Sequence, residues 1–269
     1  MRTLIFRSIL LAAVVILAAF AAVAQPAESK EKRAIGSELV GETLKFDAKV
    51  NKILKGISVA ELTMSVTSVP NDSGLMVTAE AVSKGTLLKI FRYSFLQHYD
   101  STLDPNFRIL KTSKHDVQKE RVRDSEAVFD YGKKMVSFTE TDPKDASRPP
   151  RRIASDIGEH VLDMTSAVYY LRLQPLAVGK KFELSVSDSG LVYKVPVTVT
   201  GREQQKTVLG NVWCFRLEPD VFGPGRLIDQ KGSMVIWMTD DAKHIPVHSE
   251  IKAEIGKIDI KLKSATPGK

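Results

Sequence analysis

The sequence contains very little cysteine: Cys214 is the single one among 269 residues. An internal disulfide is therefore impossible, which excludes the small disulfide-stapled folds of secreted proteins. Glycine (16), proline (12) and aromatic residues (7%) are also too few for a collagen-like or Pro/Gly-rich disordered chain, whereas 43% hydrophobic and 26% charged residues are typical of a globular protein. Cys214 lies among strand-forming apolar residues, so we expect a buried, inert thiol there rather than a nucleophile.

Motifs of the common enzyme classes are absent as well: there is no G-x-S-x-G, H-E-x-x-H, G-x-x-x-x-G-K-[ST] or G-x-G-x-x-G. The histidines show no zinc-like spacing to cysteine or glutamate; they are His98, His115, His160, His244 and His248. His244 and His248 are four residues apart, about 13 Å on an extended strand, and Pro246 disfavours a helix between them. We expect no metal, no cofactor and no catalytic residues, although a catalytic pair assembled from distant strands would escape a search by spacing.

A long apolar run occurs only at the N-terminus, at residues 9–20, where Arg2 and Arg7 precede it and Ala22-Val23-Ala24 follows. This order is typical of a signal peptide, so we expect cleavage after Ala24 and export to the periplasm. The run is shorter than the roughly 20 residues of a membrane-spanning helix, and no second span follows it. An uncleaved N-terminal anchor is the alternative.

The charge balance is mildly basic. Removal of residues 1–24 takes away two arginines and no acidic residue, which lowers the formal charge from +7 to +5. No basic stripe with interleaved aromatic residues is present, so we expect no nucleic-acid partner. Basic residues do gather at two places: Lys119, Arg121 and Arg123, and Arg148, Arg151 and Arg152. Such residues keep a sheet edge solvated, or they contact an anionic lipid or glycan.

After residue 40 the apolar residues follow a period of two. Leu44, Phe46, Ala48 and Val50 alternate with lysine and aspartate, as in a strand with one buried face. Further strands are expected at 62–66, 77–81, 90–96, 107–113, 120–129, 135–139, 182–186, 192–200, 212–217, 233–238, 247–255 and 258–262. These segments follow one another too closely for crossover helices, so antiparallel neighbours are expected.

The same patterns predict the domain organisation. Residues 25–40 are polar and aperiodic and are expected to form a flexible leader, followed by a single β-rich domain at 41–264. The proline-rich segment 141–152 is expected to be a surface loop, and the polar segment 203–210 a connection between strands. A single sheet that spans both halves would bury the alternating residues of both.

One convincing helix is expected at 163–173, where Asp163 can cap the first amides and Pro175 prevents continuation. Its first apolar stripe consists of Met164, Ala167, Val168 and Leu171. Tyr169 and Leu173 project to another side, so both sides of the helix need cover. We therefore predict a mainly β fold: an antiparallel open barrel, or a strongly curved sheet of about a dozen strands, wrapped around one helix.

Two segments resemble a family of exported bacterial proteins known only as a domain of unknown function. They are Asp163-x-x-Ser166-Ala167-x-Tyr169-Tyr170-Leu171-Arg172 with Leu176-x-x-Gly179, and Ile236-Trp237-x-Thr239-Asp240-Asp241 with Pro246-Val247 and Gly256. The resemblance covers roughly residues 44–262 and implies a periplasmic, β-rich domain without an assigned activity. The layout is also loosely similar to that of the open-barrel carriers of lipoproteins and lipids, an analogy of architecture only.

These observations favour a non-enzymatic periplasmic binding or carrier protein for an apolar or acylated ligand such as a lipid, held between the sheet and the helix. Its candidate ligand-binding residues are Tyr169, Tyr170, Arg172, Leu173 and Trp237. Aromatic residues on a buried helix are more often core packing, and a helix cap with a salt bridge is the more common role for Arg172. The alternative function is a structural or protein-interaction module of the cell envelope with a packed barrel, which contacts an envelope protein through loops such as 141–152.

Overall fold

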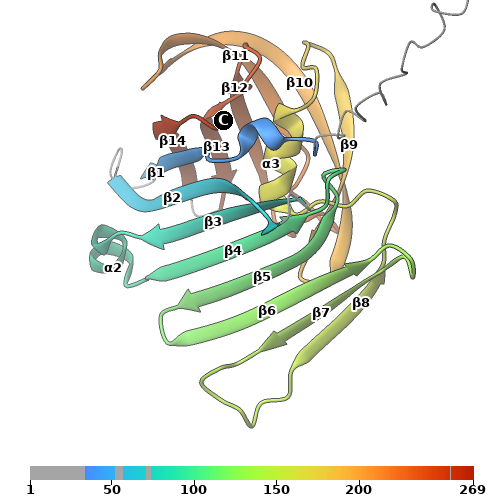
Figure 1. Cartoon of the computed structure of the whole chain (residues 1–269). Helices are drawn as coiled ribbons and strands as arrows, with labels where there is room; N and C mark the ends of the chain where they lie inside the picture. Colours follow the sequence, from blue (N-terminus) through green and yellow to red (C-terminus); the bar gives the residue numbers. More distant parts are fainter. Residues whose placement is uncertain (1–33, 52–56, 71–73, 255) are drawn as a thin grey trace, which may run out of the picture. The chain divides into compact units, whose positions relative to one another are not determined.

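Fourteen strands form one sheet in the computed structural model, which describes residues 34–51, 57–70, 74–254 and 256–269 (Figure 1). The order in the sheet is β8-β7-β6-β5-β4-β3-β2-β1-β14-β13-β12-β11-β10-β9, and neighbouring strands are antiparallel. The strands are β1 (Thr43–Asn51), β2 (Ile57–Ser68), β3 (Leu75–Ser83), β4 (Phe95–Leu103), β5 (Ile109–Gln118), β6 (Arg121–Asp130), β7 (Met135–Thr141), β8 (Arg151–Asp156), β9 (Lys181–Asp188), β10 (Leu191–Thr207), β11 (Gly210–Pro219), β12 (Gly232–Thr239), β13 (Pro246–Ala253) and β14 (Gly256–Thr266). The predicted mainly β, antiparallel fold is confirmed.

The two halves of the chain meet at the first and last strands. β1 pairs with β2 on one side and with β14 on the other, where Thr43 lies opposite Thr266. The predicted single sheet across both halves is therefore confirmed. β8 and β9 stand at the two ends of the strand order, so the sheet is open between them.

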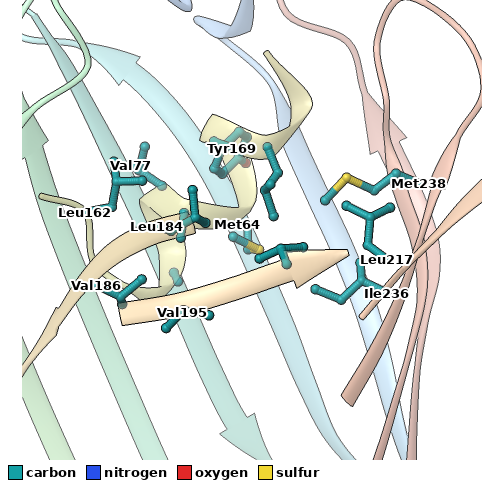
Figure 2. Packing of buried hydrophobic residues seen from close by; sticks show 14 of the residues in the cluster. Met64, Val77, Leu162, Tyr169, Leu184, Val186, Val195, Leu217, Ile236 and Met238 are labelled. Atoms are coloured by element: carbon teal, nitrogen blue, oxygen red, sulfur yellow. The ribbon is translucent and has the colours of Figure 1, made fainter. Parts of the chain in front are cut away.

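The predicted helix is α3 (Met164–Arg172) (Figure 1), and it packs against β9, which follows it in the chain, and against β3 of the first half of the sheet. Tyr169 is 1% exposed and Leu171 is 3% exposed. Figure 2 shows Tyr169 among buried side chains from both halves of the sheet, such as Met64 of β2 and Met238 of β12. The helix is therefore covered on more than one side, although Met164 of the predicted stripe is 49% exposed at the start of the helix.

Two local predictions were wrong, and one strand was missed. A short helix, α2 (Gly85–Phe91), occupies part of the strand predicted at 90–96, because seven residues are too few to reveal a helical period. The predicted surface loop 141–152 is present between β7 and β8, but β8 itself, which begins at Arg151, was missed because as an edge strand it carries few apolar residues. β10 continues to Thr207 through the predicted connection, because its polar end faces solvent on both sides.

The start of the folded unit differs from the expected leader. The unit begins at Ala34, and the 3₁₀ helix η1 (Ser37–Leu39) places Leu39 in the core at 6% exposure. Part of segment 25–40 thus belongs to the folded unit. The predicted signal peptide at 1–24 lies outside the described residues.

The turn between β9 and β10 rests on the other end of the sheet. Gly190 in this turn has φ +81°, and a Cβ atom there would lie 2.5 Å from Phe138 Cβ of β7 and 3.0 Å from Ile153 Cβ of β8. Only glycine permits both this conformation and this approach. The turn therefore brings the two ends of the open sheet together without strand pairing.

Candidate functional site

Helix α3 is anchored at its N-terminus by Asp163, which is fully buried. The Asp163 carboxylate accepts hydrogen bonds from the Ser166 backbone N–H (2.7 Å) and from the Thr165 hydroxyl (2.7 Å), and Ser166 completes a capping box. The Ser101 hydroxyl of β4 also donates to Asp163. The predicted cap is thus confirmed, and it joins the helix to the first half of the sheet.

The C-terminus of α3 is anchored by Arg172, which forms a buried bidentate ion pair with Glu42. Arg172 Nη2 lies 2.7 Å from Glu42 Oε2, and Nη1 donates to the other carboxylate oxygen. Arg172 Nε donates to the Lys243 carbonyl at 3.1 Å, and the His244 ring Nδ1 lies 2.8 Å from the Arg172 carbonyl oxygen. The helix end is thereby joined to the segment before β1 and to the turn between β12 and β13.

A hollow with a volume of about 320 Å³ opens beside this helix end. Apolar side chains form part of its wall, and charged side chains stand at its exposed positions. The lining residues are Glu38, Leu39, Glu42, Arg172, Leu173, Leu209, Ala242, Lys243, Ile245, Ala265, Thr266, Pro267, Gly268 and Lys269. The α3 hollow, as we call it, thus joins segments from both ends of the chain.

The turn between β12 and β13 forms one wall of the α3 hollow. Asp241 Oδ1 accepts hydrogen bonds from the backbone N–H groups of Lys243 (2.9 Å) and His244 (3.1 Å). An aspartate that bonds its own following amides makes a rigid turn. These hydrogen bonds hold this wall in a defined conformation.

Arg172 and Leu173 are the two predicted site residues that line the α3 hollow. Tyr169 lies in the core near Arg172, whose guanidinium carbon is 5.1 Å from the Tyr169 ring centroid. Burial, with the nearby Glu42 carboxylate, raises the pKa of Tyr169 well above its usual value. Tyr169 thus belongs to the core and is not among the residues that line the hollow.

The other two predicted residues lie elsewhere. Tyr170 packs against His160, with ring centroids 4.9 Å apart, and against Phe107 at 6.1 Å. Trp237 stacks on His248 at 4.5 Å and donates its indole N–H to Glu203. Its strand neighbours Ile236 and Met238 point into the core (Figure 2), so Trp237 is on the opposite face of the sheet.

Glu42 is the site residue that sequence reasoning missed. It lies 130 positions before Arg172 in the chain, and a lone glutamate before a strand has no local pattern that marks it as buried. A buried arginine requires a buried counter-charge. The position of Arg172 at the end of the predicted helix was therefore the one signal in the sequence that a buried acidic residue lies beside it.

Within the described parts of the chain, no group of three or more His, Cys, Asp or Glu side chains is placed to hold a metal ion. Cys214 is fully buried, and burial raises the pKa of its thiol to about 11. A thiol that stays protonated is a poor nucleophile. The structure thus gives the expected buried cysteine.

No helix in the described ranges combines the length and the apolar character needed to cross a membrane.

Two solved structures with similarity to this chain are distant from it in sequence. A β-barrel-like protein of the domain of unknown function DUF1849 from Brucella abortus is 10% identical, with a TM-score of 0.57, and the match covers 86% of this chain and 98% of that one. A protein with a YmcC-like fold from Bacteroides fragilis is 12% identical, with a TM-score of 0.32 and coverage of 84% and 96%.

The likeness to the Brucella protein therefore supports a shared barrel-like fold and nothing about activity. A search of curated proteins finds no match. The family model "Protein of unknown function (DUF3108)" matches residues 45–263, which is most of the chain and includes both segments that carried the resemblance. The chain belongs to the DUF3108 family.

Proposed function

We propose that this protein is a non-enzymatic binding or carrier protein of the bacterial cell envelope, and that it holds an apolar or acylated ligand in the α3 hollow. The observation that carries the proposal is the hollow itself: about 320 Å³, with leucine, isoleucine and alanine side chains in its wall and charged groups at its rim. Pockets for small ligands are mostly apolar with a few placed polar groups and have volumes of about 300–1,000 Å³.

The proposed ligand lies at the end of α3 and not along its side. Tyr169, Leu171 and Ala167 are packed in one core cluster with strands of both halves, so side chains of the protein occupy the space between helix and sheet. A protein interior of this kind is as dense as an organic crystal. The α3 hollow is therefore the better place for an acyl chain.

The charged groups around the hollow support a ligand with a polar end. The charge of Arg172 is compensated by Glu42, so Arg172 has a structural role at the floor of the hollow. The exposed Lys243 and Lys269 are the cations available to an anionic head. An exposed positive charge attracts anions over about 10 Å at 0.1 M salt. An acyl chain with a carboxylate or phosphate head would match this arrangement.

The envelope location in this proposal depends on the N-terminal sequence, with its basic start, apolar run and Ala22-Val23-Ala24. Cell fractionation and N-terminal sequencing of the purified protein test it. Recovery in the periplasmic fraction with Gln25 as the first residue is expected. A cytoplasmic protein that keeps residues 1–24 contradicts it.

Binding is tested with a fluorescent fatty-acyl probe, and by native mass spectrometry of protein purified from its own envelope. Ala242 lines the hollow and is exposed, so Ala242→Trp fills the hollow without disturbing the core. The matched control is Ala154→Trp, a change at an exposed alanine of β8. Loss of probe binding in the first variant alone supports the proposal. A wild-type protein that is always empty and binds no probe overturns it.

A structural or protein-interaction module is the second candidate. The continuous core around α3 favours it, because a packed barrel needs no ligand. The segment between β7 and β8 is exposed at almost every position from 141 to 149 and offers a contact surface. Crosslinking in the periplasm should then capture a partner through this loop, and a loop-shortened variant with an unchanged fold should lose it. A partner captured equally by the shortened variant contradicts this candidate.

A further inference from the structure

We propose that this protein has a second binding site, for a phosphate-type oxyanion, in a groove where the two ends of the open sheet approach each other. The seam groove, as we name it, has a volume of about 240 Å³ and is lined by Lys114, Asp116, Gln118, Arg121, Arg123, Ser125, Glu140, Arg151 and Ser189. These residues come from β5 to β8 and from the turn between β9 and β10. The site is separate from the α3 hollow and does not depend on its function.

The groove lies on the inner face of the sheet. Ser125 and Ala127 are two residues apart on β6 and share a face, and Ala127 lies in the core opposite Phe138. The lining side chains thus continue the rows that form the core further along the same strands. Ser189 closes the groove because the neighbouring Gly190 is seated on β7 and β8. A charged surface at such a position is not an ordinary solvated face.

The groove carries an excess of positive charge. Lys114, Arg121, Arg123 and Arg151 outnumber the two acidic lining residues, Asp116 and Glu140. Asp142, beside the groove, pairs with Arg123 at 2.5 Å and with Arg148 at 3.8 Å, so with Asp142 and Arg148 counted five cations face three carboxylates. The uncompensated charge favours an anion.

Three cationic groups of the groove have spare hydrogen-bond donors. Arg123 is 8% exposed; its Nη1 lies 2.5 Å from Asp142, but its Nε has no hydrogen-bond partner, and Glu140 is 4.0 Å away. Neither Lys114 nor Arg151 has a carboxylate within 4 Å in the described part of the chain. A buried donor without a partner is costly, so an acceptor from outside the chain would stabilise it.

The chemistry of these donors points to an oxyanion. Arginine presents a planar fork that matches two oxygens of a phosphate, and lysine adds a point charge. The volume of about 240 Å³ is small for a drug-sized molecule but suits a single headgroup. A free phosphate compound and the headgroup of an anionic lipid share this chemistry.

In the test, the purified protein is titrated with inorganic pyrophosphate at low salt, and binding is measured by calorimetry and by changes in amide NMR shifts. The variant Lys114→Gln/Arg151→Gln removes two cations without leaving a carboxylate unpaired, and it should weaken pyrophosphate binding at least about tenfold. The matched control Lys111→Gln/Arg152→Gln removes the same charge from the other face of the same two strands and should change binding less than about twofold.

Vesicles identify the source of the oxyanion. Binding of pyrophosphate to the seam groove indicates a free phosphate ligand. Binding only to phosphatidylglycerol vesicles, lost in the double variant and kept in the control, indicates a lipid headgroup; either result supports the site. Ser125→Glu, which adds a carboxylate to the groove, should also abolish binding. This second variant takes the place of the double variant if the double variant does not fold. Absence of binding to both probes, or equal binding by wild type and double variant, overturns the proposal.

Discussion

Glu42, just before β1, and Arg172, the last residue of α3, form a bidentate ion pair in which each residue is 4% exposed. The pair joins residues 130 positions apart in the chain, and it forms the floor of the α3 hollow. Two charges withdrawn from water are tolerated because each satisfies the other with two parallel hydrogen bonds.

Removal of one partner of this pair should strongly destabilise the fold. Glu42→Gln leaves the Arg172 charge buried and uncompensated, and we expect the free energy of unfolding to fall by about 3–5 kcal/mol. Urea denaturation measures it. Glu126→Gln, which breaks the exposed pair of Glu126 with Lys111, is the control and should cost less than about 1 kcal/mol. Equal losses in the two variants would show that the buried pair has no special role.

Gly190 should be far more sensitive to alanine than Gly210, although both have positive φ, +81° and +97°. At Gly190 a Cβ meets Phe138 and Ile153, whereas no atom lies within 4 Å of a Cβ at Gly210. Backbone strain of about 1 kcal/mol is common to both, so Gly190→Ala should cost at least about 1–2 kcal/mol more. Thermal and urea denaturation of the two variants provide the comparison. Similar losses of stability in both would contradict the close contact of the Gly190 turn with β7 and β8.

Mild acid should destabilise the protein through His160 and His248. Burial lowers the pKa of both rings below 6.5, so the folded state binds these protons more weakly than the unfolded state does. Stability is therefore full above about pH 6.5 and falls as the pH drops through the unfolded value towards the folded one. Urea midpoints at several pH values between 7.5 and 5 measure the slope. The double variant His160→Gln/His248→Gln should flatten it, and an unchanged slope contradicts the assignment.

The thiol of Cys214 should be silent in the folded protein. It is fully buried, and a pKa of about 11 leaves almost no thiolate at pH 8. An aromatic disulfide reagent should therefore react with it only after urea unfolds the chain. Rapid, complete reaction under native conditions would show that β11 opens locally.

The strand pattern of this fold could be predicted from the sequence, because burial on one face imprints a period of two on residues such as Leu44 and Phe46. The helix could also be predicted, since Asp163 and Pro175 delimit it. β8 could not, because Ile153 alone among its residues is a large apolar one and edge strands need little apolar surface.

The candidate site was predictable only in part. Arg172 and Leu173 line the α3 hollow because both follow from the helix and its end. Trp237 was grouped with them by its apolar neighbours, but strand alternation puts it on the opposite face. To predict Glu42 as a site residue, one must know which strand lies beside α3. The register between distant segments cannot be read from the local sequence.

The pairing of β1 with β14 sets the order in which the protein can be completed. Asn51 and Asp259, 208 positions apart, are hydrogen-bonded across this central pair. A chain made from its N-terminus keeps one side of β1 without a neighbour until the last strand has been synthesised, and such distant contacts form slowly. A product that terminates before residue 256 would therefore expose a bare edge in the middle of the sheet, where another chain can add and aggregation can start.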